Sequence, residues 1–298
     1  MTISDRRGQA KMPTATAKEH RLGIYQPTRR PSWLDRQVAT SWGVVRVVGK
    51  LGQAHADVMD ALLYCAERRR DLEDGRIKIL VDPARVRRVS GVGSGEQFRR
   101  LLDELMAAVV EIREPASLCC LGHLVDHVDM ARRSDGTLIT RRNPLDRGER
   151  SLWRVELGKA LCTLLEKDIW RGYNPAPIAR LRHGISQAIA RHMLSHSKAP
   201  RGGWIIDNLI RVVAGEISGG PLRHRRRELV SDAESLGMIG LHMEGDRLHR
   251  VQQKPDSVQQ KPDSVQQKPD VCSKSPALAG MSDLSGSRRA EALEGAPP

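Results

Sequence analysis

Residues 204–251 read WIIDNLIRVVAGEISGGPLRHRRRELVSDAESLGMIGLHMEGDRLHRV, and this stretch decides the fold. Apolar residues recur at helical spacing on both sides of a glycine-rich turn, which predicts a helix over 204–214 and another over 221–236. Gly237 is expected to end the second helix, since glycine is favoured just past a helix. Residues 238–251 alternate around a Glu-Gly-Asp turn, which predicts a β-hairpin. This order is typical of a winged helix.

The residues before this stretch extend the same domain. Residues 177–195 place apolar side chains on one helical face, and 153–157 and 158–167 indicate a strand and a helix. Residues 134–150 are rich in Asp, Gly and Arg and suggest a boundary. A second winged helix is therefore expected over residues 146–250.

Residues 41–145 repeat the pattern. The expected elements are a helix at 54–70, a strand at 76–81, helices at 83–90 and 94–108, and β-type segments at 109–113 and 118–130. This order predicts a first winged helix. The fold class is then α+β, mainly helical, with tandem winged-helix domains between disordered N- and C-terminal tails.

The two ends of the chain look non-globular. Residues 1–40 lack apolar periodicity and are expected to form a flexible basic arm. Residues 251–298 contain three copies of a VQQKPDS-type repeat, the last without its Ser. Each unit has one apolar residue and one Pro, so no coiled-coil seam can form, and the tail is expected to be disordered.

Charge points to a polyanion partner. The net charge is +13, of which residues 1–36 carry +5, 37–145 carry +2, 146–250 carry +6 and 251–298 carry none. Arg outnumbers Lys by 38 to 11, which suits bidentate contact with guanine and phosphate but also follows from GC-rich coding. No apolar run is long enough to span a membrane. Five cysteines without a CxxC pair favour reduced thiols in a cytoplasmic protein.

The basic run at 222–228 is the candidate DNA-binding site. Arg223 and Arg227 lie four apart and share a helix face, while Arg226 lies nearer the apolar stripe. The expected DNA-binding group is Arg223, His224 and Arg227, which face outward toward base edges, with Arg225 and Arg226 flanking them. Lys198, Arg201 and Arg211 are expected to contact phosphates, and the hairpin residues are expected to contact the adjacent DNA backbone or the minor groove: Arg247, His249 and Arg250. The alternative is a solvated cationic face without a partner.

The matching helix of the first copy has a different surface. Its outer face mixes signs, with Glu96, Arg99, Arg100, Asp103 and Glu104. The acidic residues make this face repel duplex DNA more than the basic helix at 221–236 does. The first winged helix is therefore expected to make a weaker DNA contact or a protein–protein contact.

No group of residues calls for catalysis, a metal or a cofactor. His123 and His127 are four apart near Cys119 and Cys120, but no second ligand pair has zinc-finger spacing. The Gly-rich turn at 91–95 lacks the Lys-Ser/Thr of a phosphate loop. The sequence therefore predicts a protein that is not an enzyme, without cofactor or metal.

The whole pattern resembles a known family. Two winged helices, with Arg225-Arg226-Arg227-Glu228-Leu229-Val230 followed by Leu236-Gly237-Met238, are similar to the iteron-binding replication initiators of broad-host-range bacterial plasmids, of the RepA, RepC and TrfA types. The resemblance covers about 41–271. It implies binding to repeated origin DNA, opening of an AT-rich region, recruitment of a host replicative helicase or initiator, and homodimerisation through the first winged helix.

Two alternatives remain open. The chain is also compatible with a winged-helix transcriptional repressor or a plasmid partition or copy-number regulator. The tail repeat of seven residues equals 21 nucleotides, about two turns of B-DNA. It therefore suggests either iteron DNA running into the reading frame or a peptide that binds a host protein.

Overall fold

The computed structural model describes residues 12–40, 43–114, 117–142 and 148–251. Within these ranges the structure contains both helices and strands, which confirms the mixed α and β class expected from the sequence. Two buried apolar clusters hold the elements together, a larger one drawn from residues 12–165 and a smaller one from 178–248. The repeats of the C-terminal tail lie outside the described residues.

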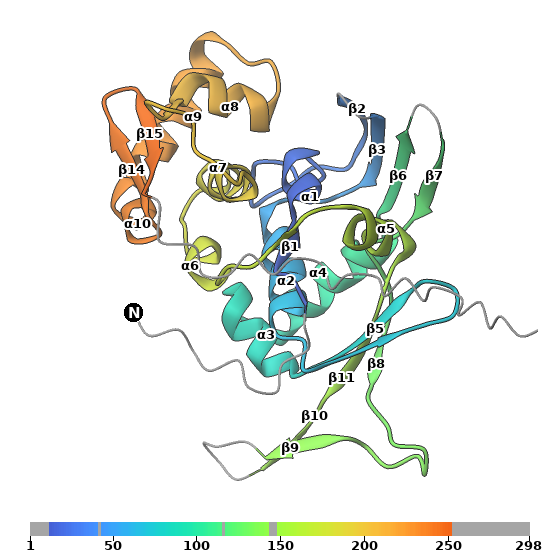
Figure 1. Cartoon of the computed structure of the whole chain (residues 1–298). Helices are drawn as coiled ribbons and strands as arrows, with labels where there is room; N and C mark the ends of the chain where they lie inside the picture. Colours follow the sequence, from blue (N-terminus) through green and yellow to red (C-terminus); the bar gives the residue numbers. More distant parts are fainter. Residues whose placement is uncertain (1–11, 41–42, 115–116, 143–147, 252–298) are drawn as a thin grey trace, which may run out of the picture. The chain divides into compact units, whose positions relative to one another are not determined.

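The first half of the chain contains two antiparallel four-stranded sheets (Figure 1). One sheet has the order β2 (Leu34–Thr40), β3 (Gly43–Gly49), β6 (Val109–Glu114) and β7 (Ser117–Gly122). The other has the order β4 (Arg68–Asp71), β5 (Ile77–Val81), β11 (Trp153–Leu157) and β8 (Val125–Met130). A separate two-stranded ribbon pairs β9 (Thr140–Arg142) with β10 (Glu149–Ser151).

Helices α2 (Gln53–Tyr64), α3 (Pro83–Ser90), α4 (Gly95–Ala107) and α5 (Lys159–Lys167) belong to the same half. The local sequence explains where α3 begins and ends. The Asp82 side chain accepts a hydrogen bond from the N–H of Ala84, and Pro83 occupies the first turn, where a missing N–H costs nothing. Gly91 ends α3 with a φ of 68°, a backbone conformation that favours glycine.

Two expectations for the first half were wrong in their boundaries. The helix expected over 54–70 ends at Tyr64, and Arg68–Asp71 form strand β4 at a sheet edge. Three consecutive arginines have no apolar side chain to bury, so an exposed edge strand suits them better than a core helix. The segment 118–130 is not one element but two strands, β7 and β8, which lie in different sheets.

The boundary expected near residue 146 also differs. Strand β11 pairs with β5 and β8 of the first half. Helix α5 buries Leu161, Leu164 and Leu165 in the larger apolar cluster. Residues 149–167 therefore complete the first half, because their apolar faces match its sheet and core rather than the smaller cluster.

The expectation of a flexible arm over 1–40 was wrong for its described residues. Residues 12–31, here called the strap, contain β1 (Ala15–Thr16), which pairs with β12 (Trp170–Arg171), and helix α1 (Ala17–Arg21). Leu22 and Ile24 are buried in the larger cluster. Two apolar residues with Gly23 between them make too short a run to predict an element, so periodicity could not reveal this segment. Residues 1–11 lie outside the described ranges.

The strap passes between the first residues of α2 and α7 (Gly184–Ser195). A Cβ atom on Gly52 would lie 2.6 Å from the Thr28 carbonyl oxygen, and one on Gly184 would lie 2.5 Å from the Thr28 Cα. Both glycines are therefore required by close backbone approach. Arg29 reinforces the crossing by donating to the carbonyl oxygens of Ala179 and Leu181.

The second half continues from β12 with shorter elements. These are α6 (Ala176–Ala179), α7, β13 (Trp204–Ile205), α8 (Ile206–Ala214), α9 (Gly219–Ser231), α10 (Ala233–Met238), β14 (Leu241–Glu244) and β15 (Arg247–Arg250). Strand β13 pairs with β15, and β15 pairs with β14. The hairpin expected over 238–251 is thus confirmed as β14 and β15, with β13 as a third strand.

The helix expected over 221–236 is divided at Asp232 into α9 and α10. The buried Asp232 carboxylate accepts hydrogen bonds from the backbone N–H groups of Arg182 and His183, which fixes the division. Gly237 was wrongly expected to end the helix. It lies inside α10, and Gly240, with a φ of 80°, takes the left-handed position instead.

The described ranges contain no helix that is both long and apolar enough to cross a membrane.

Candidate functional site

The basic run lies in the middle of α9, between the two core-facing residues of this helix. Leu222 and Leu229 are buried in the smaller apolar cluster, where α9 packs against α7 and α8. Seven residues separate them, which is two helical turns, so the side chains between them cover the remaining faces. The location of the run on the outward part of a short, packed helix agrees with the sequence prediction.

Two of the five basic residues are held by carboxylates of the protein itself. The Arg226 Nη1 atom lies 3.1 Å from the Asp207 carboxylate of α8. The Arg225 Nη1 atom lies 2.9 Å from the Glu228 carboxylate, three residues along α9. Both arginines are half-buried. Each therefore has part of its charge offset and its rotamer restrained within the protein.

Arg223 and Arg227 differ from their neighbours. Both side chains are exposed, and neither makes a hydrogen bond or ion pair with any residue that the structure describes. They are four residues apart and so lie on one face of α9. Together with Gly220 and Arg226 they line an open concave surface. The structure thus places two uncompensated guanidinium groups side by side.

The glycines before this face leave space around it. A Cβ atom on Gly215, Gly219 or Gly220 would meet no atom within 4 Å. Gly215 and Gly219 have φ values of 85° and 58°, which explains why glycine occurs there. Gly220 is not among the positive-φ glycines, so neither backbone conformation nor internal packing accounts for it.

His224 faces a carboxylate that is already occupied. Its Nε2 atom lies 3.5 Å from a Glu228 oxygen, and the Nδ1 atom of His183 lies 3.5 Å from the same oxygen. With Arg225 on the other oxygen, Glu228 is contacted by three basic side chains. The positive charge of α9 is therefore concentrated on Arg223 and Arg227.

The six residues expected to contact DNA beside the basic run differ in exposure and in hydrogen bonding. Lys198 and Arg201 are exposed in the loop between α7 and β13, and their side chains form no hydrogen bond or ion pair with the described residues, whereas Arg211 donates to Asn208 on its own helix. Arg247 is exposed and donates to the Gly202 carbonyl oxygen. His249 on β15 is half-buried, 3.6 Å from Glu244.

Arg250 was wrongly expected to be available for DNA. Its guanidinium donates to the carbonyl oxygens of Met193, His196 and Ser197, at 3.0, 2.7 and 3.1 Å. These carbonyls lie at the end of α7, where backbone acceptors lack helical partners and a cation is favoured. Arg250 therefore caps α7 and ties it to the hairpin.

The outer face of α4 keeps the mixed signs expected for it. Glu96, Arg99, Arg100 and Asp103 are all exposed. Glu104 is instead half-buried and lies 2.7 Å from His55 and 3.1 Å from Lys50. The accessible charges on this face nearly cancel, unlike those of α9.

Sequence reasoning missed a buried polar network between α2 and α7. The Arg191 guanidinium donates to Gln53, Asp57 and Asp60, at 2.7, 2.6 and 2.9 Å. The Arg191 side chain is 2% exposed, and those of Asp57 and Asp60 are 1% and 0% exposed. A detectable signal existed, because Gln53, Asp57 and Asp60 form a polar stripe at i, i+4, i+7 on an otherwise apolar helix.

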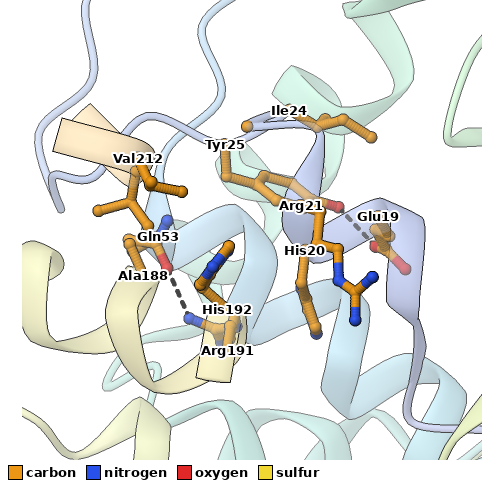
Figure 2. A pocket seen from close by; sticks show the side chains of 12 residues that line it. Glu19, His20, Arg21, Ile24, Tyr25, Gln53, Ala188, Arg191, His192 and Val212 are labelled. Atoms are coloured by element: carbon orange, nitrogen blue, oxygen red, sulfur yellow. Dashed lines mark hydrogen bonds between the residues drawn. The ribbon is translucent and has the colours of Figure 1, made fainter. Parts of the chain in front are cut away.

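The strap contributes to the same network. Tyr173 donates to Asp60 at 3.0 Å and lies 2.7 Å from the His20 Nε2 atom, while Tyr25 donates to Glu19 at 3.1 Å. Figure 2 shows Glu19, Tyr25, Gln53 and Arg191 around a small pocket. The strap, α2 and α7 are thus joined by polar contacts, which suits a structural role.

Burial changes the acid–base behaviour of these groups. Burial, and then the negative charge of Asp60, raise the pKa of Glu19 from 4.5 to about 8. Burial also raises the pKa of Asp57 and Asp60, although Arg191 opposes the change. Burial lowers the pKa of Arg191, but Asp60 and Asp57 more than reverse this and hold it above its usual range.

Cysteine and histidine positions do not form a metal site in the described residues, where no group of three potential ligands was found. Cys65 and Cys162 are buried free thiols, and burial raises their pKa values to about 12 and about 11. Such thiols stay protonated and unreactive near neutral pH. The His123 Nδ1 atom is 2.9 Å from the Ala108 carbonyl oxygen, which is an ordinary structural contact.

No protein-family model matches the sequence, and no curated protein or solved structure matches the chain.

Proposed function

We propose that the chain binds duplex DNA through α9 and that its second half is a winged helix. The order of elements supports this assignment: α7, β13, α8 and α9 precede the β14–β15 hairpin, and β13 pairs with β15. In helix-turn-helix proteins the second helix of the pair enters the major groove, and here that helix is α9.

The observation that carries the proposal is the pair of uncompensated arginines, Arg223 and Arg227. Arginine without an internal counter-ion, exposed on one helix face, is suited to the phosphates and base edges of DNA. Exposed Lys198, Arg201 and Arg247 add positive charge from the neighbouring loop and hairpin.

The biological role we propose is plasmid replication initiation in the bacterial cytoplasm, by binding directly repeated origin sequences. The resemblance to iteron-binding initiators supports this role, and with it origin opening and recruitment of a host helicase or initiator. The first half is proposed as the homodimerisation module. The near balance of accessible charge on α4 supports a protein contact there rather than a strong DNA contact.

The experiment compares two charge-matched double variants of the full chain. Arg223→Ala/Arg227→Ala on α9 is expected to weaken binding to duplex DNA, and the change in salt dependence measures how many of the two arginines contact phosphates. Arg99→Ala/Arg100→Ala on α4 removes the same charge and is expected to have a much smaller effect. Fluorescence anisotropy over a salt series, with DNA flanking the gene, gives both quantities.

A replication readout separates the proposed role from its alternative. A plasmid carrying the gene and its flanking DNA is expected to replicate with the α4 variant but not with the α9 variant. Failure of the unaltered plasmid to replicate, together with repression of the gene's own promoter, would indicate a repressor or copy-number regulator. Equal DNA binding by the two double variants would refute the assignment of α9.

A further inference from the structure

We infer that Arg223 and Arg227 each read one guanine. The bound sequence then carries two guanines, either on adjacent base pairs or with one base pair between them. The inference rests on the proposed DNA-binding function and specifies the sequence that the same site recognises. It divides the basic run into two base-reading arginines and two positioning arginines.

The division follows from the contacts of each guanidinium. Bidentate recognition of the guanine O6 and N7 atoms uses two N–H donors in one plane. Arg226 and Arg225 each direct a terminal Nη atom to an internal carboxylate, at 3.1 and 2.9 Å. Presenting that edge to a base would break the ion pair. Arg223 and Arg227 lose no internal contact when they bind.

The two tethered arginines still have a role. The Arg226–Asp207 pair joins α9 to α8, and Arg226 borders the same open surface as Arg223 and Arg227. It therefore fixes the rotation of α9 relative to the supporting helix. Arg225 occupies the Glu228 carboxylate, which keeps that negative charge from pairing with a base-reading arginine.

Helix geometry sets the spacing of the two guanines. Residues four apart are separated by about 6 Å along an α-helix. Base pairs follow one another at about 3.4 Å along B-DNA. Two arginines of this spacing therefore span one to two base-pair steps when the helix lies along the groove.

The surroundings allow a close approach by bases. Gly220 borders the open surface, and a side chain there would be the first atom to reach toward a partner. Glycine is a poorer helix former than alanine, and no packing inside the described protein requires glycine at position 220. Close packing of a partner against the backbone accounts for the absence of a side chain at Gly220.

The test is selection of binding sites from a library of duplexes with a randomised central stretch, using the full chain. The unaltered protein is expected to select two guanines at the stated spacing. Single-base substitution at each guanine should then weaken binding about 5- to 150-fold. Arg223→Ala should abolish the preference at one guanine only, and Arg227→Ala at the other only.

Lysine variants distinguish base reading from charge. Arg223→Lys and Arg227→Lys keep the charge but lose the bidentate fork, so each should lose its guanine preference while the salt dependence stays unchanged. Arg99→Lys, on the exposed face of α4, serves as the matched control and should keep both preferences. Thermal unfolding should be similar for all variants at the two exposed positions, which excludes misfolding as a cause.

Two outcomes would overturn the inference in different ways. Equal weakening of every sequence by Arg223→Ala and Arg227→Ala, with a smaller salt dependence, would show phosphate contacts and leave the proposed DNA binding intact. Absence of binding to any duplex by the unaltered protein would overturn both the inference and the proposed function.

Discussion

The effect of a charged residue in this protein depends on what lies within hydrogen-bonding distance of it. Residues 223–227 of α9 are all basic, yet Asp207 and Glu228 hold two of them in place. Arg223 and Arg227 keep their charges for an external partner. Buried Glu19 is the opposite case, because its surroundings favour the neutral acid.

Glu19 should make stability depend on pH. Its pKa is about 8 in the folded protein and 4.5 as the ordinary value, so folding favours the protonated form. The contribution is fully present below about pH 4.5 and is lost as the pH rises toward 8, because the unfolded chain releases the proton first. Glu19→Gln should therefore gain stability relative to the unaltered protein across this range.

Denaturant unfolding at several pH values between 4.5 and 8 measures the difference. The glutamine side chain can still accept the hydrogen bond from Tyr25, so packing is preserved. Asp71→Asn, at an exposed position, controls for the loss of a surface carboxylate. A stability difference that does not change with pH would show that Glu19 titrates normally in the fold.

At the scale of elements, the hairpin of β14 and β15 carries two arginines, three residues apart, with different roles. Arg247 lies near the turn and is exposed, while Arg250 caps the end of α7. Alternation along a strand allows this, but spacing alone does not say which arginine meets solvent. The carbonyl oxygens that hold Arg250 lie more than fifty residues away in the sequence.

Replacing these two arginines should separate stability from binding. Arg250→Ala removes charge-assisted hydrogen bonds to three carbonyl groups and should destabilise the protein by about 1–3 kcal/mol, with the salt dependence of DNA binding unchanged. Arg247→Ala should leave stability nearly unchanged and reduce that salt dependence by about one phosphate equivalent. Urea unfolding and anisotropy titrations on the same samples measure both, and the reverse pattern would contradict the assignment.

Sequence patterns predicted the elements that follow a regular period. The apolar stripes of α4, α8 and α9 and the alternation of the final hairpin located these elements, and with them the basic face. The patterns failed where partners are distant or unperiodic. The strap has no regular apolar pattern. The sequence of β11 does not indicate whether this strand joins a sheet of the first or of the second half. The division at Asp232 depends on two backbone N–H groups about fifty residues earlier in the chain.

At the scale of the whole molecule, the two halves are joined in the described residues by polar as well as apolar contacts. Helices α2 and α7 contact each other, and Arg191 of α7 donates hydrogen bonds to Asp57 and Asp60 of α2. A buried arginine with two buried aspartates is costly to desolvate and is tolerated only when its hydrogen bonds are satisfied. This network therefore favours one relative arrangement of α2 and α7 over others.

Removing the cation should be more damaging than removing the whole charged set. Arg191→Met leaves Asp57 and Asp60 buried without their counter-ion and should destabilise the protein by about 3–5 kcal/mol. The triple variant Arg191→Met/Asp57→Asn/Asp60→Asn removes the unpaired charges as well and should recover part of that loss. Urea unfolding measures both, and a triple variant less stable than the single one would argue against an electrostatic cause.

The position of the strap has a consequence for the order of events during folding. Thr14 hydrogen-bonds to Tyr173, which lies 159 residues later in the chain. The strap is synthesised before its partners on β12 and α7, which lie well over a hundred residues later in the chain. Closing a loop of this length is entropically slow, and high contact order lowers folding rates. We therefore expect the strap to dock late, so that the larger core is completed only after the smaller one has formed.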